Sequence, residues 1–303
     1  MPGNVANAGT LQVSSGAITL TGNWSNSGTF TQGTSTVTLN GTSQSISGTT
    51  TFYGLSKTVT TAYTLTFEAT ETQTVTDSLT LKGASGQLLS IRSSVADTQA
   101  ALTLDDGSQD LDYLDVKDSD ASGGDVLAAG VNSTNSGNND NWTFKIISVT
   151  LRDAGDTTGY TTWAIGTDKA VDTVYLMDID NCVLVKNDGN VAEDFSIIVS
   201  GGTGTNWTLA TTNAQNQCVL MGLFNGNAAP IAGNFSPTHD IIDGDTRWAT
   251  ESTGDGIYEG ANDGDNVAVG EGEKLYIYLE TPLTVTSGLQ ETITVTIGAR
   301  EDE

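Results

Sequence analysis

The chain has 303 residues, of which 37% are hydrophobic, and this supplies enough apolar material for two β-rich domains of ordinary size. A net charge of −26, from 11 Lys and Arg against 37 Asp and Glu, excludes nucleic acid and anionic membrane surfaces as expected partners. No apolar run reaches the roughly 18 residues of a membrane span, so we expect no membrane insertion. The first ten residues also lack the basic and apolar regions of a signal peptide.

Short β-strands are predicted along residues 1–144, where apolar residues alternate with Thr between turns rich in Gly, Asn, Ser and Asp. In the segment TSTVTLN, Val37 and Leu39 alternate with Thr, so one face of the extended strand is apolar. The same pattern predicts strands at 17–20, 63–67, 74–82 and 101–104. Short strands separated by small polar turns are typical of a stacked architecture, so we predict a β-solenoid for this domain.

The segment NAGTLQVSSGAITL, residues 7–20, contains good strand-forming residues, no charge and no proline. Charge and proline are the usual features that keep an edge strand from pairing with another chain. We therefore expect an open strand edge near the amino terminus. Such an edge predicts self-assembly of the chain into a homopolymer.

Residues 145–303 are predicted to form a second all-β domain, with longer strands and denser aromatic and branched residues. A long acidic insertion, about residues 225–268, is rich in Gly, Asp and Asn, and we expect it to run over the surface. Alternation within the strand-like runs predicts a core made of Val183, Val185, Phe195, Ile197, Val199, Trp207, Leu275, Ile277, Leu279, Ile293, Val295 and Ile297.

Cys182 and Cys218 are the two cysteines of the chain, and each lies inside an apolar strand-like run. Their spacing fits neither a zinc site nor a redox CxxC motif. One hypothesis is an intramolecular disulfide between them, as expected in an extracellular protein. The alternative is two buried thiols that act as small apolar residues.

Acidic turns in both regions could bind calcium, because Ca²⁺ takes six to eight oxygen ligands from carboxylates, carbonyls and amides on flexible loops. None of these turns has the spacing of an EF-hand loop, and solvated acidic turns are the alternative interpretation. The candidate ligands are Asp118, Asp120, Asp125, Asp178, Asp180, Asp243, Asp245, Asp263 and Asp265.

Catalysis is not expected from this sequence. His239 is the sole histidine, and no nucleophile-elbow pattern accompanies it. With 37 acidic residues, carboxylate pairs of the kind used in glycoside hydrolysis arise by coincidence. Polysaccharide lyase chemistry usually depends on basic residues, and residues 1–144 contain only Lys57, Lys82, Arg92 and Lys117.

Two segments carry a resemblance to a known class of proteins. GNWSNSGTFTQGTSTVTLNGTSQSISGTTTFYGL and LDYLDVKDSDASGGDVLAAGVNSTNSGNNDNWTF resemble repeats of large secreted bacterial surface proteins, which are read as right-handed parallel β-helices. The second region resembles the immunoglobulin-like β-sandwich domains appended to secreted proteins. The resemblance implies an extracellular structural subunit of a surface layer, filament or adhesive stalk.

The alternative function is a carbohydrate-binding module that recognises a cell-surface glycan. Such a module stacks sugar rings on an aromatic platform and reads their hydroxyls with polar groups. The candidate platform residues are Tyr160, Trp163, Trp248 and Tyr258. Aromatic residues packed in the core or under loops are the competing interpretation.

Overall fold

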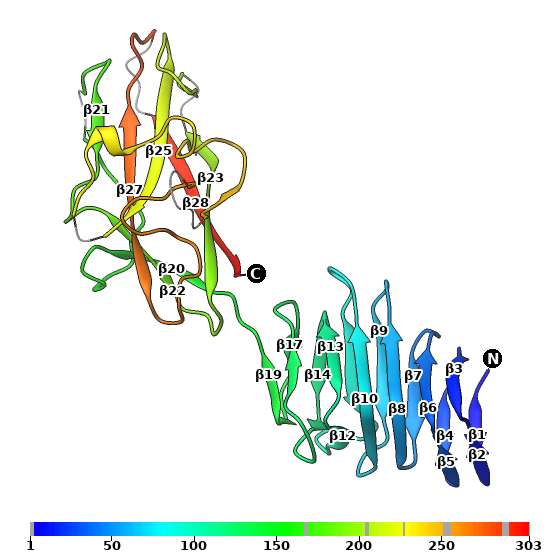
Figure 1. Cartoon of the computed structure of the whole chain (residues 1–303). Coiled ribbons are helices and arrows are strands. Elements are labelled where there is room, and N and C mark those ends of the chain that lie inside the picture. The colour runs from blue at the N-terminus through cyan, green and yellow to red at the C-terminus, as the bar shows by residue number, and fades with distance from the viewer. Residues whose placement is uncertain are drawn as a thin grey trace. The chain divides into compact units, whose positions relative to one another are not determined.

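The computed structural model describes residues 3–166, 169–203, 206–226, 228–250, 256–286 and 291–302, with the side chains of residues 201–203 left out. Contacts divide the chain into two compact units, unit 1 (Met1–Lys145) and unit 2 (Ile146–Glu303), drawn in Figure 1. The prediction of an all-β protein is confirmed, because the described residues form strands and one short 3₁₀ turn, η1 (Ala232–Asn234). None of the described helical segments is long and apolar enough to cross a membrane.

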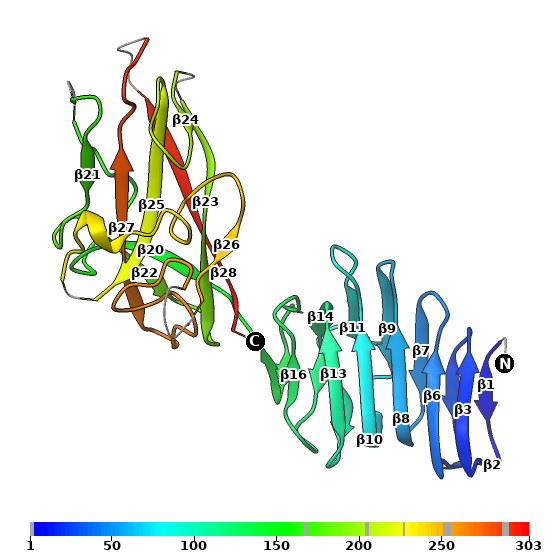
Figure 2. The same cartoon turned by 45° about the horizontal axis from the view of Figure 1, so that its top comes forward.

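Unit 1 consists of parallel strands stacked in ladders, as Figures 1 and 2 show. The chain visits the ladders in turn, so each circuit adds one strand beside that of the circuit before. The seven-stranded sheet contains, in spatial order, β1 (Val5–Asn7), β4 (Trp24–Asn26), β7 (Gln44–Ser47), β9 (Tyr63–Phe67), β11 (Leu89–Ser93), β14 (Leu114–Lys117) and β17 (Thr134–Asn135).

The eight-stranded sheet of unit 1 contains β18 (Asn139–Asp140), β15 (Ser119–Asp120), β12 (Ala100–Leu104), β10 (Thr72–Lys82), β8 (Thr50–Thr58), β6 (Thr34–Leu39) and β3 (Ser15–Leu20), with β13 (Ser108–Asp112) also paired to β10. Two smaller parallel pairs complete the circuits: β2 (Thr10–Gln12) with β5 (Thr29–Thr31), and β16 (Leu127–Ala129) with β19 (Trp142–Phe144).

The parallel register of unit 1 stacks apolar residues on apolar residues. Ile18 pairs with Val37, and Val37 pairs with Leu55 in the next circuit. One continuous core results, because inward-facing positions align from strand to strand. Near its amino-terminal end the core contains Trp24, whose ring centroid lies 4.9 Å from that of Phe30 and 5.3 Å from that of Phe52. The strands predicted in this region are confirmed, within β3, β6, β9, β10 and β12.

Unit 2 contains two sheets whose strands are mostly antiparallel and whose side chains share one core. The larger sheet contains β20 (Val149–Asp153), β22 (Val183–Asn187), β27 (Gly272–Glu280), β25 (Gln217–Asn225) and β24 (Thr208–Leu209), with β21 (Val174–Leu176) also paired to β27. The smaller sheet contains β26 (Arg247–Trp248), β23 (Glu193–Thr203) and β28 (Thr292–Glu301).

Of the twelve core residues predicted for unit 2, seven are buried and five are half-buried. Val183, Val185, Phe195, Ile197, Leu275, Ile277 and Leu279 are buried. The other predicted members are half-buried and pack against this core: Val199, Trp207, Ile293, Val295 and Ile297. Three of these five lie on β28, at the end of the smaller sheet.

The prediction that residues 225–268 run over the surface is wrong. This segment contributes buried side chains to the core, namely Phe235, Ile241, Ile242, Ala249, Tyr258 and Val267. Backbone bridges hold it to both sheets, for example from Ile241 to Met221 of β25 and from Val267 to Glu193 of β23. The insertion therefore completes the core instead of leaving it.

Candidate functional site

The amino-terminal circuit of unit 1 forms one end of the stacked ladders. Its strands β1, β2 and β3 each pair with one neighbour, β4, β5 and β6, and in the described residues no strand lies on their other side. Half-buried apolar side chains of this circuit pack against the core, namely Val5, Leu11, Val13 and Ile18. Residues 1–56 contain no charged side chain. In the described residues, this end therefore carries no charged side chain and leaves one side of each of its strands without a paired strand.

A buried lysine lies inside unit 1. The side chain of Lys57 on β8 is 0% exposed, and its Nζ donates to Gly41 O (3.0 Å), Thr42 O (2.9 Å) and Gln44 Oε1 (2.7 Å). All three acceptors are neutral, and burial lowers the pKa of Lys57 to about 8. The ammonium thus joins β8 to the turn between β6 and β7.

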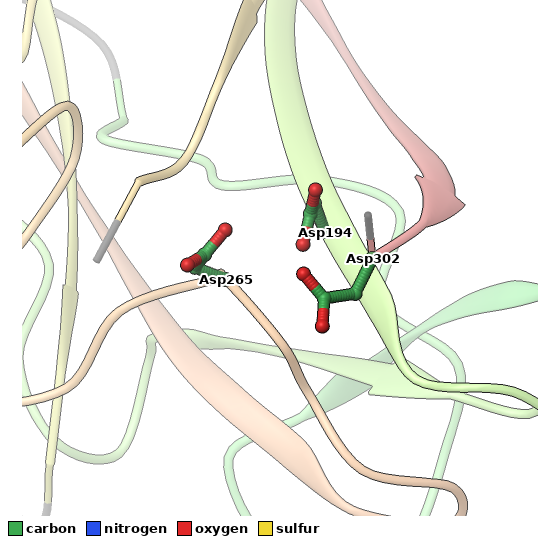
Figure 3. Close-up of side chains that lie close together, drawn as sticks. All are labelled: Asp194, Asp265 and Asp302. Atoms are coloured by element: carbon green, nitrogen blue, oxygen red, sulfur yellow. The ribbon is translucent and has the colours of Figure 1, made fainter.

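Three carboxylates of unit 2 come together in a cluster that could hold a metal ion. Asp194, Asp265 and Asp302 each offer a carboxylate oxygen, and these atoms lie within 4.8 Å of one another. Figure 3 shows that the side chains converge from β23, from the loop before β27 and from the end of β28. Asp194 is 1% exposed, whereas the other two are half-buried. Clustered carboxylates of this kind suit a hard cation such as Ca²⁺.

Protein groups also balance part of the negative charge of this cluster. The carboxylate of Asp194 accepts hydrogen bonds from Arg300 Nε (2.9 Å) and from the backbone N–H of Asn266 (3.1 Å). The guanidinium of Arg300 lies over the ring of Trp248, 4.7 Å from its centroid. A cation bound here would therefore share Asp194 with Arg300.

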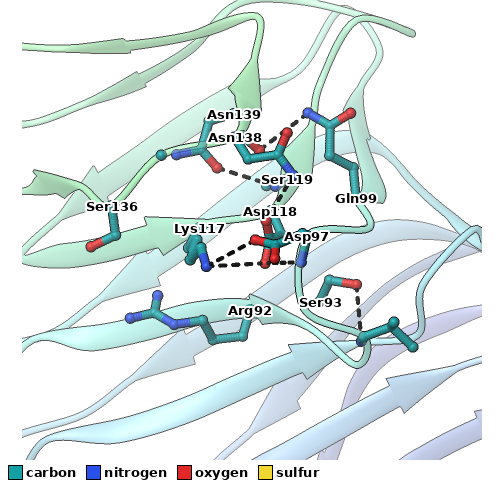
Figure 4. Close-up of polar contacts among 12 residues, drawn as sticks. Arg92, Ser93, Asp97, Gln99, Lys117, Asp118, Ser119, Ser136, Asn138 and Asn139 are labelled. Atoms are coloured by element: carbon teal, nitrogen blue, oxygen red, sulfur yellow. Dashed lines mark hydrogen bonds and ion pairs between the residues drawn. The ribbon is translucent and has the colours of Figure 1, made fainter.

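Among the predicted calcium ligands, Asp265 alone lies in this cluster. Asp118 instead accepts hydrogen bonds within unit 1. Asp118 is 3% exposed and its backbone has a positive φ of 58°. Its carboxylate accepts from Asn138 Nδ2 (2.7 Å) and from the backbone N–H of Asp97 (3.1 Å), as Figure 4 shows. These bonds lower the pKa of Asp118, with the Asn138 bond contributing most. Asp118 therefore joins successive circuits of unit 1.

Several other predicted ligands close turns. Asp120 accepts from the backbone of Ser122, and Asp178 accepts from that of Asp180. Asp243 accepts from the backbone of Asp245 and forms an ion pair with Arg247 (2.7 Å). Asp263 accepts a long hydrogen bond from the backbone of Asp265 (3.4 Å). Asp125, Asp180 and Asp245 are exposed, and in the described residues no group of three carboxylates includes them.

The predicted disulfide is corrected by the structure, in which Cys182 and Cys218 are buried free thiols. Next to Cys182, Val183 pairs with Leu275, and next to Cys218, Val219 pairs with Glu280. The cysteines therefore flank β27 on opposite sides and are offset by several residues, roughly 15 Å along the strand, whereas a disulfide needs Cα atoms within about 7 Å. Burial raises the pKa of both thiols, that of Cys218 to about 11.

The four aromatic residues proposed as a sugar platform are not exposed. Tyr258 is 0% exposed and donates its hydroxyl to the backbone of the core, which leaves no face for a ligand. Tyr160 and Trp163 are half-buried and pack against the core of unit 2. Trp248 is half-buried beneath Arg300.

Sequence reasoning missed Asp194, Asp302 and Arg300. Asp194 precedes an apolar run, EDFSIIV, which gives no sign of a polar site. The signal lies in the pairing of β23 with β28, which places Asp194 opposite Arg300.

A scan against protein-family models and searches of curated proteins and of solved structures find no match to the chain.

Proposed function

We propose that this protein is an extracellular structural subunit that assembles with copies of itself through β-strand edges, in a surface layer, filament or adhesive stalk. Unit 1 serves as a β-solenoid and unit 2 as an immunoglobulin-like sandwich. The resemblance of the repeats to secreted bacterial surface proteins supports this assignment. The proposal includes no catalytic activity.

The observation that carries the proposal is the open amino-terminal circuit. Strands β1, β2 and β3 each have a partner on one side in the described residues, and half-buried apolar side chains of this circuit pack against the core. A strand from another copy would pair with the outer side of these strands and cover these side chains. Since residues 1–56 are uncharged, this end can approach another chain despite the net charge of −26.

Calcium enters the proposal as a promoter of assembly. Asp194, Asp265 and Asp302 supply oxygen ligands of the kind that Ca²⁺ prefers. Millimolar Ca²⁺ would also reduce repulsion between acidic subunits, which is screened over about 8 Å at physiological salt. The carbohydrate-binding alternative is less well supported, because its four candidate aromatics are buried or half-buried.

A single charged substitution in the amino-terminal circuit tests the proposal. We expect Val5→Asp to reduce the fraction of species larger than a dimer at least tenfold in light scattering, because an inward-pointing charge discourages strand pairing. Val95→Asp introduces the same residue at a position that is 52% exposed, and should leave assembly unchanged. Equal assembly by Val5→Asp and Val95→Asp would remove the amino-terminal contact from the proposal.

A further inference from the structure

The two sheets of unit 2 end in five edge strands, and four of them are short or covered. Strands β24 and β26 contain only two residues each, and β21 contains three. Strand β20 has charged residues at its end, Arg152 and Asp153, and the turn after it folds back over its edge. In that turn the backbone N–H of Tyr160 donates to Leu151 O, and the backbone N–H of Asp153 donates to Thr158 O, both at 2.9 Å. These features protect four edges from pairing.

The fifth edge, β28, has no such protection along most of its length. It has ten residues and pairs with β23 from Thr292 to Glu301, while in the described residues no strand lies on its other side. Figures 1 and 2 show β28 beside β23. Thr292–Ala299 contains no charge and no proline. The register between β23 and β28 shifts at one point, where β23 has an extra residue between Val199 and Gly201.

Burial indicates that the sheet is incomplete beyond β28. On the central strand β23, the core-facing side chains of Phe195 and Ile197 are 0% exposed. On β28, Ile293, Val295 and Ile297 pack against the same core but remain half-buried. A strand added beside β28 would cover these three side chains and satisfy its unpaired backbone groups.

We propose that β28 pairs antiparallel with β28 of a second copy of this chain. The strand is self-complementary, because core-facing Ile293, Val295 and Ile297 alternate with exposed Thr292, Thr294 and Thr296. A twofold axis at Val295 places Ile293 opposite Ile297 of the other copy, and Thr294 opposite its Thr296. Such cross-strand pairs stabilise a sheet. The uncharged run brings no like charges together, although each chain carries −26.

The β28 contact deepens the proposed function, self-assembly, because it is a second assembly surface. It does not depend on the amino-terminal contact. The β28 contact is isologous, so alone it closes as a dimer. Together with a contact at the amino-terminal circuit, it gives each chain two separate surfaces, and a polymer can grow. A variant that blocks the amino-terminal circuit should therefore stop at the dimer.

The experiment uses the full chain carrying Val5→Asp, so that only the β28 contact is measured. Adding Thr294→Asp and Thr296→Asp should convert the dimer to monomer in sedimentation velocity, with at least a tenfold loss of association, because the new carboxylates face one another across the axis. Thr161→Asp with Thr162→Asp adds the same charge at exposed positions outside β28, and this control should remain dimeric.

Charge-swapped mixing identifies the partner strand. The variant with Thr294→Lys and Thr296→Lys should also be monomeric, while an equimolar mixture of the Lys and Asp variants should form heterodimers. In the parent chain, amide hydrogen exchange of residues 292–299 should slow as concentration rises. A dimer that persists in the Asp variant, a mixture that stays monomeric, or exchange that does not slow with concentration would each overturn the proposal. A Val5→Asp parent that is monomeric at high concentration would overturn it as well, whereas polymers in that parent would count against the amino-terminal contact alone.

Discussion

Lys57→Met should make unit 1 less stable at pH 7 by about 2–4 kcal/mol and should remove its stabilisation by alkaline pH. The substitution removes the donor that reaches Gly41 O, Thr42 O and Gln44 Oε1, although Gln44 Oε1 still accepts from the backbone N–H of Gly41 (2.9 Å). An acceptor left buried without a hydrogen bond costs about 1–3 kcal/mol, and the apolar Met recovers part of this loss through packing.

The pH dependence follows from the low pKa of Lys57, about 8 in the folded chain against 10.5 in the unfolded chain. Between these two values the unfolded state still binds the proton while the folded state has released it. The free energy of unfolding therefore rises with pH across this window, by about 3 kcal/mol in total. Below pH 8 both states bind the proton, and the full cost of the buried charge is present.

Pulse proteolysis in urea with subtilisin at pH 7.5 and pH 10 measures this effect, with cleavage in unit 1 identified by mass spectrometry. The matched control is Lys82→Met, because Lys82 forms an exposed ion pair with Asp110. That control should lose less than about 1 kcal/mol of the free energy of unfolding. It should also keep the rise of that free energy with pH that the parent chain shows. If Lys57→Met shows the same rise with pH as the parent, the buried ammonium does not cause it.

Arg300→Gln should destabilise unit 2 by about 2–4 kcal/mol. The substitution removes the cation bonded to buried Asp194, while Asp265 and Asp302 remain nearby. It also removes the contact of the guanidinium with Trp248. Because Arg300 is partly exposed, we expect less than the loss for a fully buried ion pair.

Calcium should restore part of this loss, because a divalent cation can take the place of the guanidinium beside the three carboxylates. The thermal midpoint of unit 2, measured by calorimetry with and without millimolar Ca²⁺, should therefore rise more in Arg300→Gln than in the parent chain. Arg152→Gln breaks a half-exposed ion pair with Asp156 and should cost less than about 1 kcal/mol. Equal losses for the two variants, with no response to Ca²⁺, would contradict the role given to the cluster.

The strands could be predicted from the sequence because alternation is a local signal. Val37 and Leu39 alternate with Thr, and both are buried in β6 as expected. The parallel register was not predictable, because it depends on pairing between successive circuits whose sequences are all rich in Gly, Ser and Thr. The sequence left the place of Tyr258 open for a related reason, because DGIYEG has the composition of a loop although its tyrosine fills the core.

The candidate cation cluster was mostly hidden from sequence analysis. Asp265 stands in an acidic turn and could be proposed from composition. Asp194 and Asp302 become neighbours only when β23 and β28 pair over their length. Asp118 shows the converse, because an acidic turn that suggests a metal ligand instead supplies a hydrogen-bond acceptor between stacked circuits.

Sedimentation velocity of the unmodified chain over a wide concentration range, with millimolar Ca²⁺ and with chelator, tests self-assembly most directly. We predict species larger than the monomer that grow with concentration, are favoured by Ca²⁺ and are reversed by chelation. A chain that remains monomeric at the highest concentration with Ca²⁺ present would contradict the assignment as a self-assembling subunit.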